Sequence, residues 1–292
     1  MTTHHHSGSS EGRAPAPRRI ELGGMIADSY GVDDDRTPLV LLHGLTYSRR
    51  TWAPVTAELE RVDSGRRVVA LDLPGHGQSP SRMPHTLEHV AALVHEAVTQ
   101  AGLREPVVVG HSMSGGLALV YGAAHPVRGV VNIDAPPDEF LGFAPQLRAM
   151  QAQLRSPAFD EIWAGLRAGF TLEALPAPVR ELVDATSTPR QDLALSYWQE
   201  VFDSPDGDFR PMLAGVGHEL ERHGVPVLFL LGHEPSPALA TLLPALVAQA
   251  RVLAWPGTGH FPHLARLRQF ARLLADTADW RPRQPVDHGV TR

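Results

Sequence analysis

The chain of 292 residues contains no cysteine. Without thiols it cannot form disulfide bridges, thiolate zinc sites, iron–sulfur clusters or a cysteine nucleophile. It also lacks any apolar run that approaches the roughly 20 residues of a membrane-spanning helix, and its N-terminus lacks the basic-then-apolar order of a signal peptide. We therefore expect a cytoplasmic protein with no membrane partner.

An excess of positive charge is absent as well. The chain has 26 Lys and Arg residues against 32 Asp and Glu residues, which gives a formal net charge of -6 at pH 7. Such a balance provides no basic field for a polyanion, so we expect no nucleic-acid partner. Hydrophobic residues make up 43% of the chain, which is ordinary for a globular protein long enough to bury a substantial core.

Both ends of the chain are poor in large apolar residues. Residues 1–19 read MTTHHHSGSSEGRAPAPRR, and residues 281–292 read RPRQPVDHGVTR. Because such segments cannot bury enough apolar surface to offset the entropy of ordering, we expect two flexible tails. The three consecutive histidines of the first tail are interpreted as part of that tail. No convincing set of metal ligands occurs among the 16 histidines, and we expect neither a metal nor another cofactor.

From Ile20 onward, short apolar runs alternate with stretches that carry apolar residues at helical spacing. This alternation is typical of a mostly parallel sheet with helices on both faces. A hairpin across Gly23-Gly24 is expected to open the sheet. The predicted strands are 38–42, 67–71, 106–110, 129–134, 226–231 and 250–255, and the predicted helices are 52–60, 85–101, 115–124, 237–247 and 262–276.

The alternation stops between Asp134 and Pro226. About 90 residues there contain no clear strand, and their amphipathic pieces are 146–155, 159–170, 177–185 and 192–202. Ligands bind beyond the carboxyl ends of strands in such sheets, so a helical insertion leaving one of those ends would cover the crevice. We therefore predict an α/β core formed by residues 20–137 and 218–280, with a helical lid formed by residues 138–217.

Residues 110–116 read Gly-His-Ser-Met-Ser-Gly-Gly and lie between a predicted strand and a predicted helix. A serine at such a strand-to-helix turn forms a nucleophile elbow, whose strained backbone needs small neighbours two positions away on either side. Ser112 is the predicted nucleophile. The position two residues later holds Ser114 in place of the usual glycine, and we expect its side chain to face packing or to bond to the backbone.

A nucleophilic serine needs two backbone N–H groups to stabilise the oxyanion of its tetrahedral intermediate. We expect Met113 to provide one, because it follows the nucleophile at the start of a helix. Leu45 is expected to provide the other, since it follows a strand and the His43-Gly44 pair. His43 is expected to brace this loop and to lie at the substrate site.

The general base is expected on a loop after the last strand. Residues 253–262 read Leu-Ala-Trp-Pro-Gly-Thr-Gly-His-Phe-Pro, a strand followed by a glycine-rich turn and His260. His263 competes for the role, but it lies about one helical turn later and is expected to face the surface or the lid. We therefore assign His260 as the base.

Together these segments resemble the α/β-hydrolase fold family. The resemblance covers roughly residues 20–276 and rests on His43-Gly44 after a strand, the segment 72–79 (Asp-Leu-Pro-Gly-His-Gly-Gln-Ser) after the next, the elbow and the Gly-Thr-Gly-His segment that ends at His260. The family uses the 72–79 turn structurally, so Asp72 is not expected to be catalytic. A serine nucleophile also argues against haloalkane dehalogenase or epoxide hydrolase chemistry, where relatives carry aspartate.

The resemblance leaves two candidates for the carboxylate that orients the base. Most members place it after the strand that precedes the histidine's strand, where this chain reads Leu231-Gly232-His233-Glu234-Pro235-Ser236. Pro235 occupies the usual aspartate position, and Glu234 lies one residue earlier. Haloalkane dehalogenases and zearalenone lactonases include members whose acid ends the strand after the elbow helix, which here is Asp134. We prefer Asp134 and keep Glu234 as the alternative.

These residues predict a serine hydrolase that cleaves a small or medium apolar carboxylic ester or lactone through an acyl-enzyme. Four aromatic residues are expected to contact the substrate, three of them in the lid: Phe140, Trp163, Trp198 and Phe261. The same residues could act on a carbon–carbon, amide or thioester bond or in perhydrolysis. The fold also hosts ligand-binding relatives without activity.

Overall fold

The computed structural model describes residues 16–204 and 208–280. Eight strands form one sheet in the order β1-β2-β4-β3-β5-β6-β7-β8. Neighbouring strands from β4 to β8 run parallel, which confirms the predicted fold class. The strands are β1 (Arg18–Leu22), β2 (Met25–Tyr30), β3 (Leu39–Leu42), β4 (Val68–Leu71), β5 (Val107–His111), β6 (Gly129–Ile133), β7 (Val227–Leu231) and β8 (Ala250–Ala254).

The antiparallel edge of the sheet is the expected hairpin. Leu22 pairs with Met25 across Gly23-Gly24, and both glycines have positive φ angles of 54° and 71°, as a two-residue hairpin turn requires. The predicted tail of residues 1–19 is too long at its C-terminal end, because Arg18 and Arg19 pair with Ser29 and Asp28 in this hairpin. Residues 1–15 and the predicted tail of residues 281–292 lie outside the described residues.

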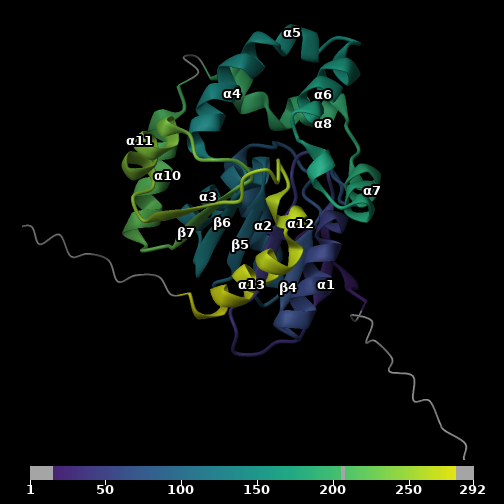
Figure 1. Ribbon diagram of the computed structural model, residues 1–292, viewed down its shortest axis with the longest axis vertical. Coiled ribbons are helices and arrows are strands. Elements are labelled where there is room, and N and C mark those ends of the chain that lie inside the picture. The colour runs from purple at the N-terminus through teal and green to yellow at the C-terminus, as the bar shows by residue number, and fades with distance from the viewer. Residues whose placement is uncertain (1–15, 205–207, 281–292) are drawn as a thin grey trace, which may run out of the picture.

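Two hydrophobic cores lie on opposite faces of the sheet. Alternate residues of a strand point to opposite faces, so Val40 and Leu42 of β3 join one core while Leu39 and Leu41 join the other. Helices α2 (Leu87–Gln100), α3 (Met113–Ala124), α10 (Arg210–Arg222) and α11 (Pro237–Leu246) cover the first face, and helices α1 (Ala53–Val62), α12 (Pro262–Ala265) and α13 (Leu267–Asp276) cover the second (Figure 1).

A layer of helices lies over one end of the sheet, between β6 and β7 in the sequence (Figure 1). It consists of α4 (Pro137–Ala149), α5 (Gln151–Leu154), α6 (Phe159–Ala168), α7 (Ala177–Thr186), α8 (Gln191–Tyr197) and α9 (Gln199–Asp203). The predicted lid boundary at residue 217 falls inside α10, which packs against α3 of the core. No helix of the described residues is long and apolar enough to cross a membrane.

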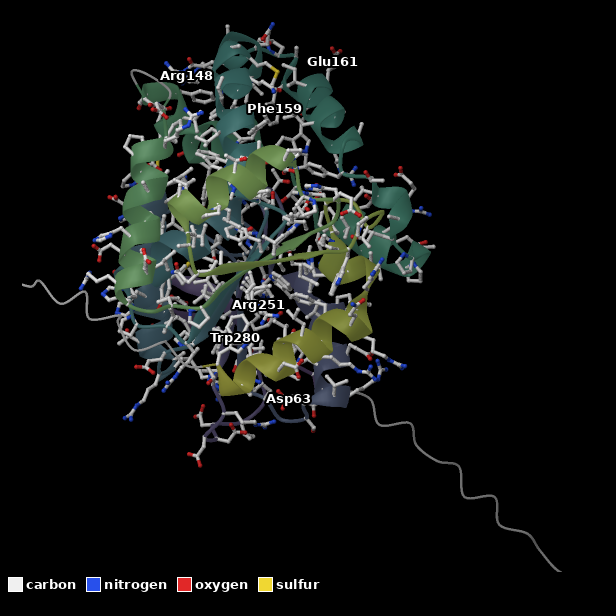
Figure 2. The ribbon with its side chains drawn as sticks, turned by 60° about the vertical axis from the view of Figure 1, so that its left-hand side comes forward. Asp63, Arg148, Phe159, Glu161, Arg251 and Trp280 are labelled. Atoms are coloured by element: carbon white, nitrogen blue, oxygen red, sulfur yellow. The ribbon has the colours of Figure 1, made fainter. Side chains whose placement is uncertain are left out.

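The inserted helices and the start of β6 lie toward opposite ends of the molecule. Figure 2 shows Phe159 among the upper helices, whereas Trp280 and Asp63 lie toward the opposite end of the molecule. Trp280 covers Gly129 at the start of β6, where an added Cβ atom would lie 2.3 Å from the indole ring. Trp280 therefore covers the start of β6 at one end of the sheet, and the inserted helices lie over the other end.

Candidate active site

Ser112 lies at a sharp turn between β5 and α3. Its φ and ψ angles are 55° and −129°, a region that non-glycine residues occupy only under strain. The turn brings the backbone back on itself, so that a Cβ atom added to Gly110 would lie 1.8 Å from the carbonyl oxygen of Ser114. This is the geometry of a nucleophile elbow, which presents the serine hydroxyl at the end of the sheet.

The end of β6 lies directly beside this turn. The N–H of Ser112 donates to the carbonyl of Ile133 over 2.8 Å, and the N–H of Asp134 donates to the carbonyl of Leu230 over 2.8 Å. Asp134 has a positive φ angle of 53°, which turns its side chain out of the β6 direction. Neighbouring strand ends therefore hold Ser112 and Asp134 at the same edge of the sheet.

His260 and Asp134 form a hydrogen-bonded pair. Nδ1 of His260 lies 2.8 Å from Oδ2 of Asp134, and Oδ1 of Asp134 accepts the N–H of Gly232 over 2.8 Å. Burial acts to raise the pKa of Asp134, but the hydrogen bond and charge of His260 outweigh it and the pKa is lowered. The carboxylate is thus kept ionised and fixed, as an orienting acid must be.

Glu234, the alternative acid, is exposed and forms no hydrogen bond or ion pair with His260 among the described residues. Its neighbour His233 turns back toward the site, with Nε2 at 2.7 Å from Oε1 of Glu139 and 3.8 Å from Oδ1 of Asp134. Burial acts to lower the pKa of His233, but its bond to the Glu234 carbonyl and the nearby carboxylates raise it. Sequence reasoning missed this second imidazole beside Asp134.

His111, which precedes the nucleophile, joins the elbow to the histidine loop. Its Nε2–H donates to the carbonyl of His260 over 2.8 Å, and the two rings lie 4.8 Å apart between centroids. Burial lowers the pKa of His111 to about 3. The ring is therefore neutral near pH 7 and acts as a hydrogen-bond donor to the loop. In the sequence, only the place of His111 between a predicted strand and the nucleophile indicated this role.

The loop after β3 lies against the nucleophile. A Cβ atom at Gly44 would lie 3.1 Å from Nδ1 of His111 and 3.2 Å from Cβ of Ser112, so the loop packs closely against the elbow. Within the described residues, the backbone N–H groups of Leu45 and Met113 have no hydrogen-bond partner. Both are the groups that sequence analysis assigned to the oxyanion.

His43 braces the loop as expected, but it does not lie open to the substrate site. Its side chain is fully buried, Nδ1–H donates to the Gly44 carbonyl over 2.8 Å, and Nε2 accepts the N–H of Leu73 over 3.1 Å. Burial lowers its pKa, so this neutral tautomer persists at neutral pH. With both ring nitrogens bonded to backbone, His43 braces the loop and is not available to a substrate.

The 72–79 turn is structural, as the sequence analysis expected. The buried carboxylate of Asp72 accepts the N–H groups of Arg49 (2.7 Å) and Gln78 (2.8 Å) and forms an ion pair with the Arg49 guanidinium. The hydroxyl of Ser79 donates to the carbonyl of Asp72 over 2.7 Å. The Asp72 carboxylate therefore holds two loops together. Its oxygens are occupied by these bonds and are not available for catalysis.

The inserted helices contact the site through Phe170, whose ring stacks on that of His260 at 4.4 Å between centroids and 26° between planes. The carbonyl of Phe170 accepts the N–H of His260 over 3.1 Å. The histidine loop packs closely against this residue, because a Cβ atom at Gly259 would lie 2.7 Å from the Phe170 carbonyl oxygen. Phe170 thus fixes the histidine loop through both its ring and its carbonyl.

Two aromatic residues near His260 differ from the sequence prediction. Phe261, expected to contact substrate, is buried and packs edge-on against the ring of Tyr47 at 5.4 Å. His263, expected at the surface or lid, is buried between Trp52 and His111. Both side chains therefore pack into the core beneath the histidine loop.

The aromatic residues predicted for the lid form a cluster of their own. Trp163 lies between Phe159 at 6.1 Å and Trp198 at 6.0 Å, and Phe140 packs against Phe209 at 5.1 Å. All are buried or half-buried in the same hydrophobic core. Their contact with a substrate stays a prediction.

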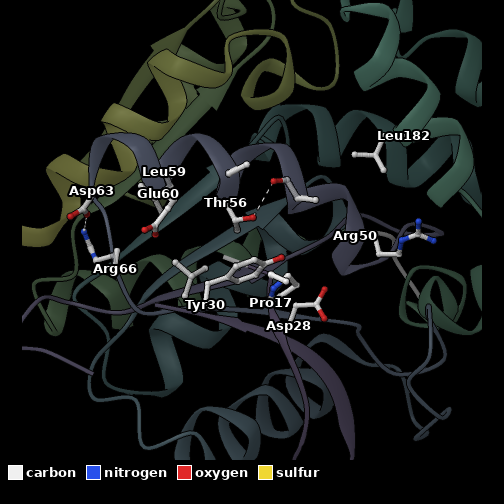
Figure 3. A pocket seen from close by; sticks show the side chains of 14 residues that line it. Pro17, Asp28, Tyr30, Arg50, Thr56, Leu59, Glu60, Asp63, Arg66 and Leu182 are labelled. Carbon is white, nitrogen blue, oxygen red and sulfur yellow. Dashed lines mark hydrogen bonds and ion pairs between the residues drawn. The ribbon is translucent and has the colours of Figure 1, made fainter. Parts of the chain in front are cut away.

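A separate cavity of about 520 Å³ lies between α1 and β2 (Figure 3). Its walls include Tyr30, Thr56 and Glu60, and neither Ser112 nor His260 lines it. The cavity therefore does not belong to the site at the end of the sheet.

Comparisons with known proteins agree with this architecture. The dihydrolipoyllysine-residue acetyltransferase component of the acetoin cleaving system of Pseudomonas putida is 26% identical over 90% of this chain and 69% of its own length. The pimeloyl-acyl-carrier-protein methyl ester esterase of Yersinia enterocolitica is 26% identical over 82% of this chain and 92% of its own length. Four other curated relatives match over only 38% to 46% of their own length.

Among solved structures, the enol-lactonase of Burkholderia xenovorans superposes with a TM-score of 0.66 at 19% identity, covering 89% of this chain and 99% of that one. At this identity the likeness concerns the fold alone. A model of the alpha/beta hydrolase family matches residues 39–273, a span that contains the elbow, the loop after β3 and the His260–Asp134 pair. The chain belongs to the α/β-hydrolase family and carries the fold of a hydrolase.

Proposed function

We propose that this protein is a serine hydrolase that cleaves a small or medium apolar carboxylic ester or lactone. The observation that carries the proposal is the 2.8 Å bond between Nδ1 of His260 and Oδ2 of Asp134, at the same sheet edge as the strained Ser112. A base held by an ionised carboxylate beside an elbow serine is the arrangement that acyl transfer uses.

In the proposed reaction, the hydroxyl oxygen of Ser112 attacks the substrate carbonyl carbon while Nε2 of His260 takes its proton. The N–H groups of Leu45 and Met113 donate to the oxyanion, each such donor contributing about 3 kcal/mol to transition-state stabilisation. His260 then protonates the leaving alcohol oxygen, which departs and leaves an acyl ester on Ser112. Water, deprotonated by His260, hydrolyses this ester and restores the serine hydroxyl.

The substrate class is proposed from the inserted helices and from relatives. We assign the walls of the acyl pocket to the aromatic cluster of the inserted helices, in which Trp163 and Trp198 contact each other, and apolar walls favour an acyl or lactone group of low polarity. An ester is the substrate named for the Yersinia relative, and a lactone for the Burkholderia structure. Both bonds present the same carbonyl to a serine nucleophile.

A fluorophosphonate probe tests the proposal, because it reacts covalently only with an activated serine. We expect labelling of the wild type and none of Ser112→Ala, with p-nitrophenyl butyrate hydrolysis lost in the same variant. Ser64→Ala, which removes an exposed hydroxyl bonded to Glu60, serves as the matched control and should be labelled like the wild type. A folded wild type that is not labelled, or equal labelling of Ser112→Ala, would overturn the proposal in favour of a ligand-binding member of the family.

A further inference from the structure

Ser114 differs from the glycine that the elbow pattern favours, and the difference creates a hydrogen bond. Its side chain is fully buried, and Oγ donates to the backbone carbonyl of His43. A glycine at this position has no side chain and could not make the bond. The bond spans 71 residues of sequence and links α3 to the loop after β3.

The carbonyl that accepts the Ser114 bond belongs to the peptide between His43 and Gly44. The N–H of Leu45, the proposed oxyanion donor, belongs to the next peptide along the chain. In the following peptide, the Gly44 carbonyl accepts Nδ1–H of His43 over 2.8 Å and the N–H of Tyr47 over 3.1 Å. The C=O of Gly44 and the N–H of Leu45 belong to one trans peptide and point in opposite directions. By fixing the carbonyl, these two bonds therefore also fix the direction of the Leu45 N–H. Two successive peptides of the loop are thus fixed by side chains.

The other end of the Ser114 bond lies on the helix that carries the second donor. Met113 is the first residue of α3 and Ser114 the second, so both move with the same helical turn. The loop itself touches the elbow, because a Cβ atom at Gly44 would lie 3.2 Å from Cβ of Ser112. A single hydroxyl therefore ties the peptide that precedes the Leu45 donor to the helix that bears the Met113 donor.

We infer that Ser114 is a positioning residue that sets the separation between the N–H groups of Leu45 and Met113. This inference rests on the proposed function, since it assigns how the proposed oxyanion site is held. Oxyanion donors act on the transition state and not on the bound substrate. Loss of the hydroxyl should therefore lower kcat and leave KM nearly unchanged.

Three variants separate the hydrogen bond from the volume of the side chain. Ser114→Ala removes the hydroxyl, Ser114→Gly restores the favoured elbow residue, and Ser114→Cys keeps the volume but offers only a weak donor. We expect kcat for p-nitrophenyl butyrate to fall about 5- to 10-fold in all three, the scale of one neutral hydrogen bond, with KM within about twofold. Thr277→Val, which deletes a buried hydroxyl bonded to the Leu274 carbonyl in the last helix, is the matched control and should keep wild-type kcat.

A trifluoromethyl ketone gives the second measurement, because its hemiketal with Ser112 places an oxyanion between the two donors. Its inhibition constant should rise across the Ser114 variants in proportion to the loss of kcat/KM. Wild-type kcat in Ser114→Ala, or a loss confined to KM, overturns the inference while the proposed function stands. A wild type that neither hydrolyses the ester nor reacts with fluorophosphonate overturns the proposed function, and the inference falls with it.

Discussion

Replacement of His111 tests whether the imidazole beside the nucleophile is held neutral in the folded protein. Burial lowers its pKa to about 3, whereas an unfolded histidine titrates near pH 6.5. Below pH 6.5 the unfolded chain therefore binds a proton that the folded chain does not, so the free energy of unfolding falls as the pH falls. For these two pKa values, the loss between pH 7.5 and pH 5 is about 2 kcal/mol.

His111→Gln removes this titration and keeps a side-chain N–H near the His260 carbonyl. Other buried histidines such as His263 also have lowered pKa values, so the wild type should lose more stability than His111 alone accounts for. The difference between wild type and variant isolates His111. We expect His111→Gln to lose about 2 kcal/mol less than the wild type between pH 7.5 and pH 5.

Urea unfolding followed by circular dichroism at both pH values measures this difference directly. His218→Gln, which removes an exposed imidazole of α10, controls for the loss of a histidine from the chain. If His111→Gln and the wild type lose the same free energy on acidification, the imidazole is not a buried neutral group. Its assignment as a fixed donor to the histidine loop would then be wrong.

Three further substitutions test the supports of the site. Gly110→Ala places a Cβ atom 1.8 Å from the Ser114 carbonyl oxygen, so thermal unfolding should show a loss of about 1–3 kcal/mol or more; an unchanged melting temperature would contradict the tight elbow. Phe170→Ala removes the ring stacked on His260 and should lower kcat about 3- to 10-fold, the scale of one aromatic pair. An unchanged kcat in steady-state kinetics would show that this ring does not position His260. Asp72→Asn removes one of the two carboxylates paired with the buried Arg49, which keeps Asp28 at 2.9 Å, and should cost about 1–3 kcal/mol in urea unfolding. The folded variant should stay reactive to fluorophosphonate, and lost reactivity at full stability would make Asp72 catalytic.

The order and type of the core elements could be predicted from the sequence because each strand is a short apolar run between helical patterns. The predicted strand ends agree within one residue with β3 and β5. Helix α10 was not predicted, since its two glycines weaken the helical pattern. One of them, Gly217, lies against α11, where a Cβ atom would be 1.3 Å from the Leu246 carbonyl oxygen. Close helix packing, which no local pattern records, explains that glycine.

At the site, local motifs identified the turn of Ser112 but not the partner of the base. The choice between Asp134 and Glu234 depends on how far two neighbouring strands extend and on the positive φ angle of Asp134, and neither is visible in the sequence. The burial of His43 and Phe261 was likewise hidden, because His43 follows a strand and Phe261 precedes a short helix, where a side chain can point inward or outward. Tertiary packing decides between the two directions.

The orienting carboxylate is the part of the account that the sequence left open, and turnover of two isosteric variants tests it most directly. With p-nitrophenyl butyrate at pH 7.5, Asp134→Asn should lower kcat by about 10³- to 10⁴-fold, the loss known for neutralising the acid of a serine triad. Glu234→Gln, an exposed substitution, should stay within about twofold of the wild type. A loss of turnover confined to Glu234→Gln would contradict the proposed Ser112–His260–Asp134 triad.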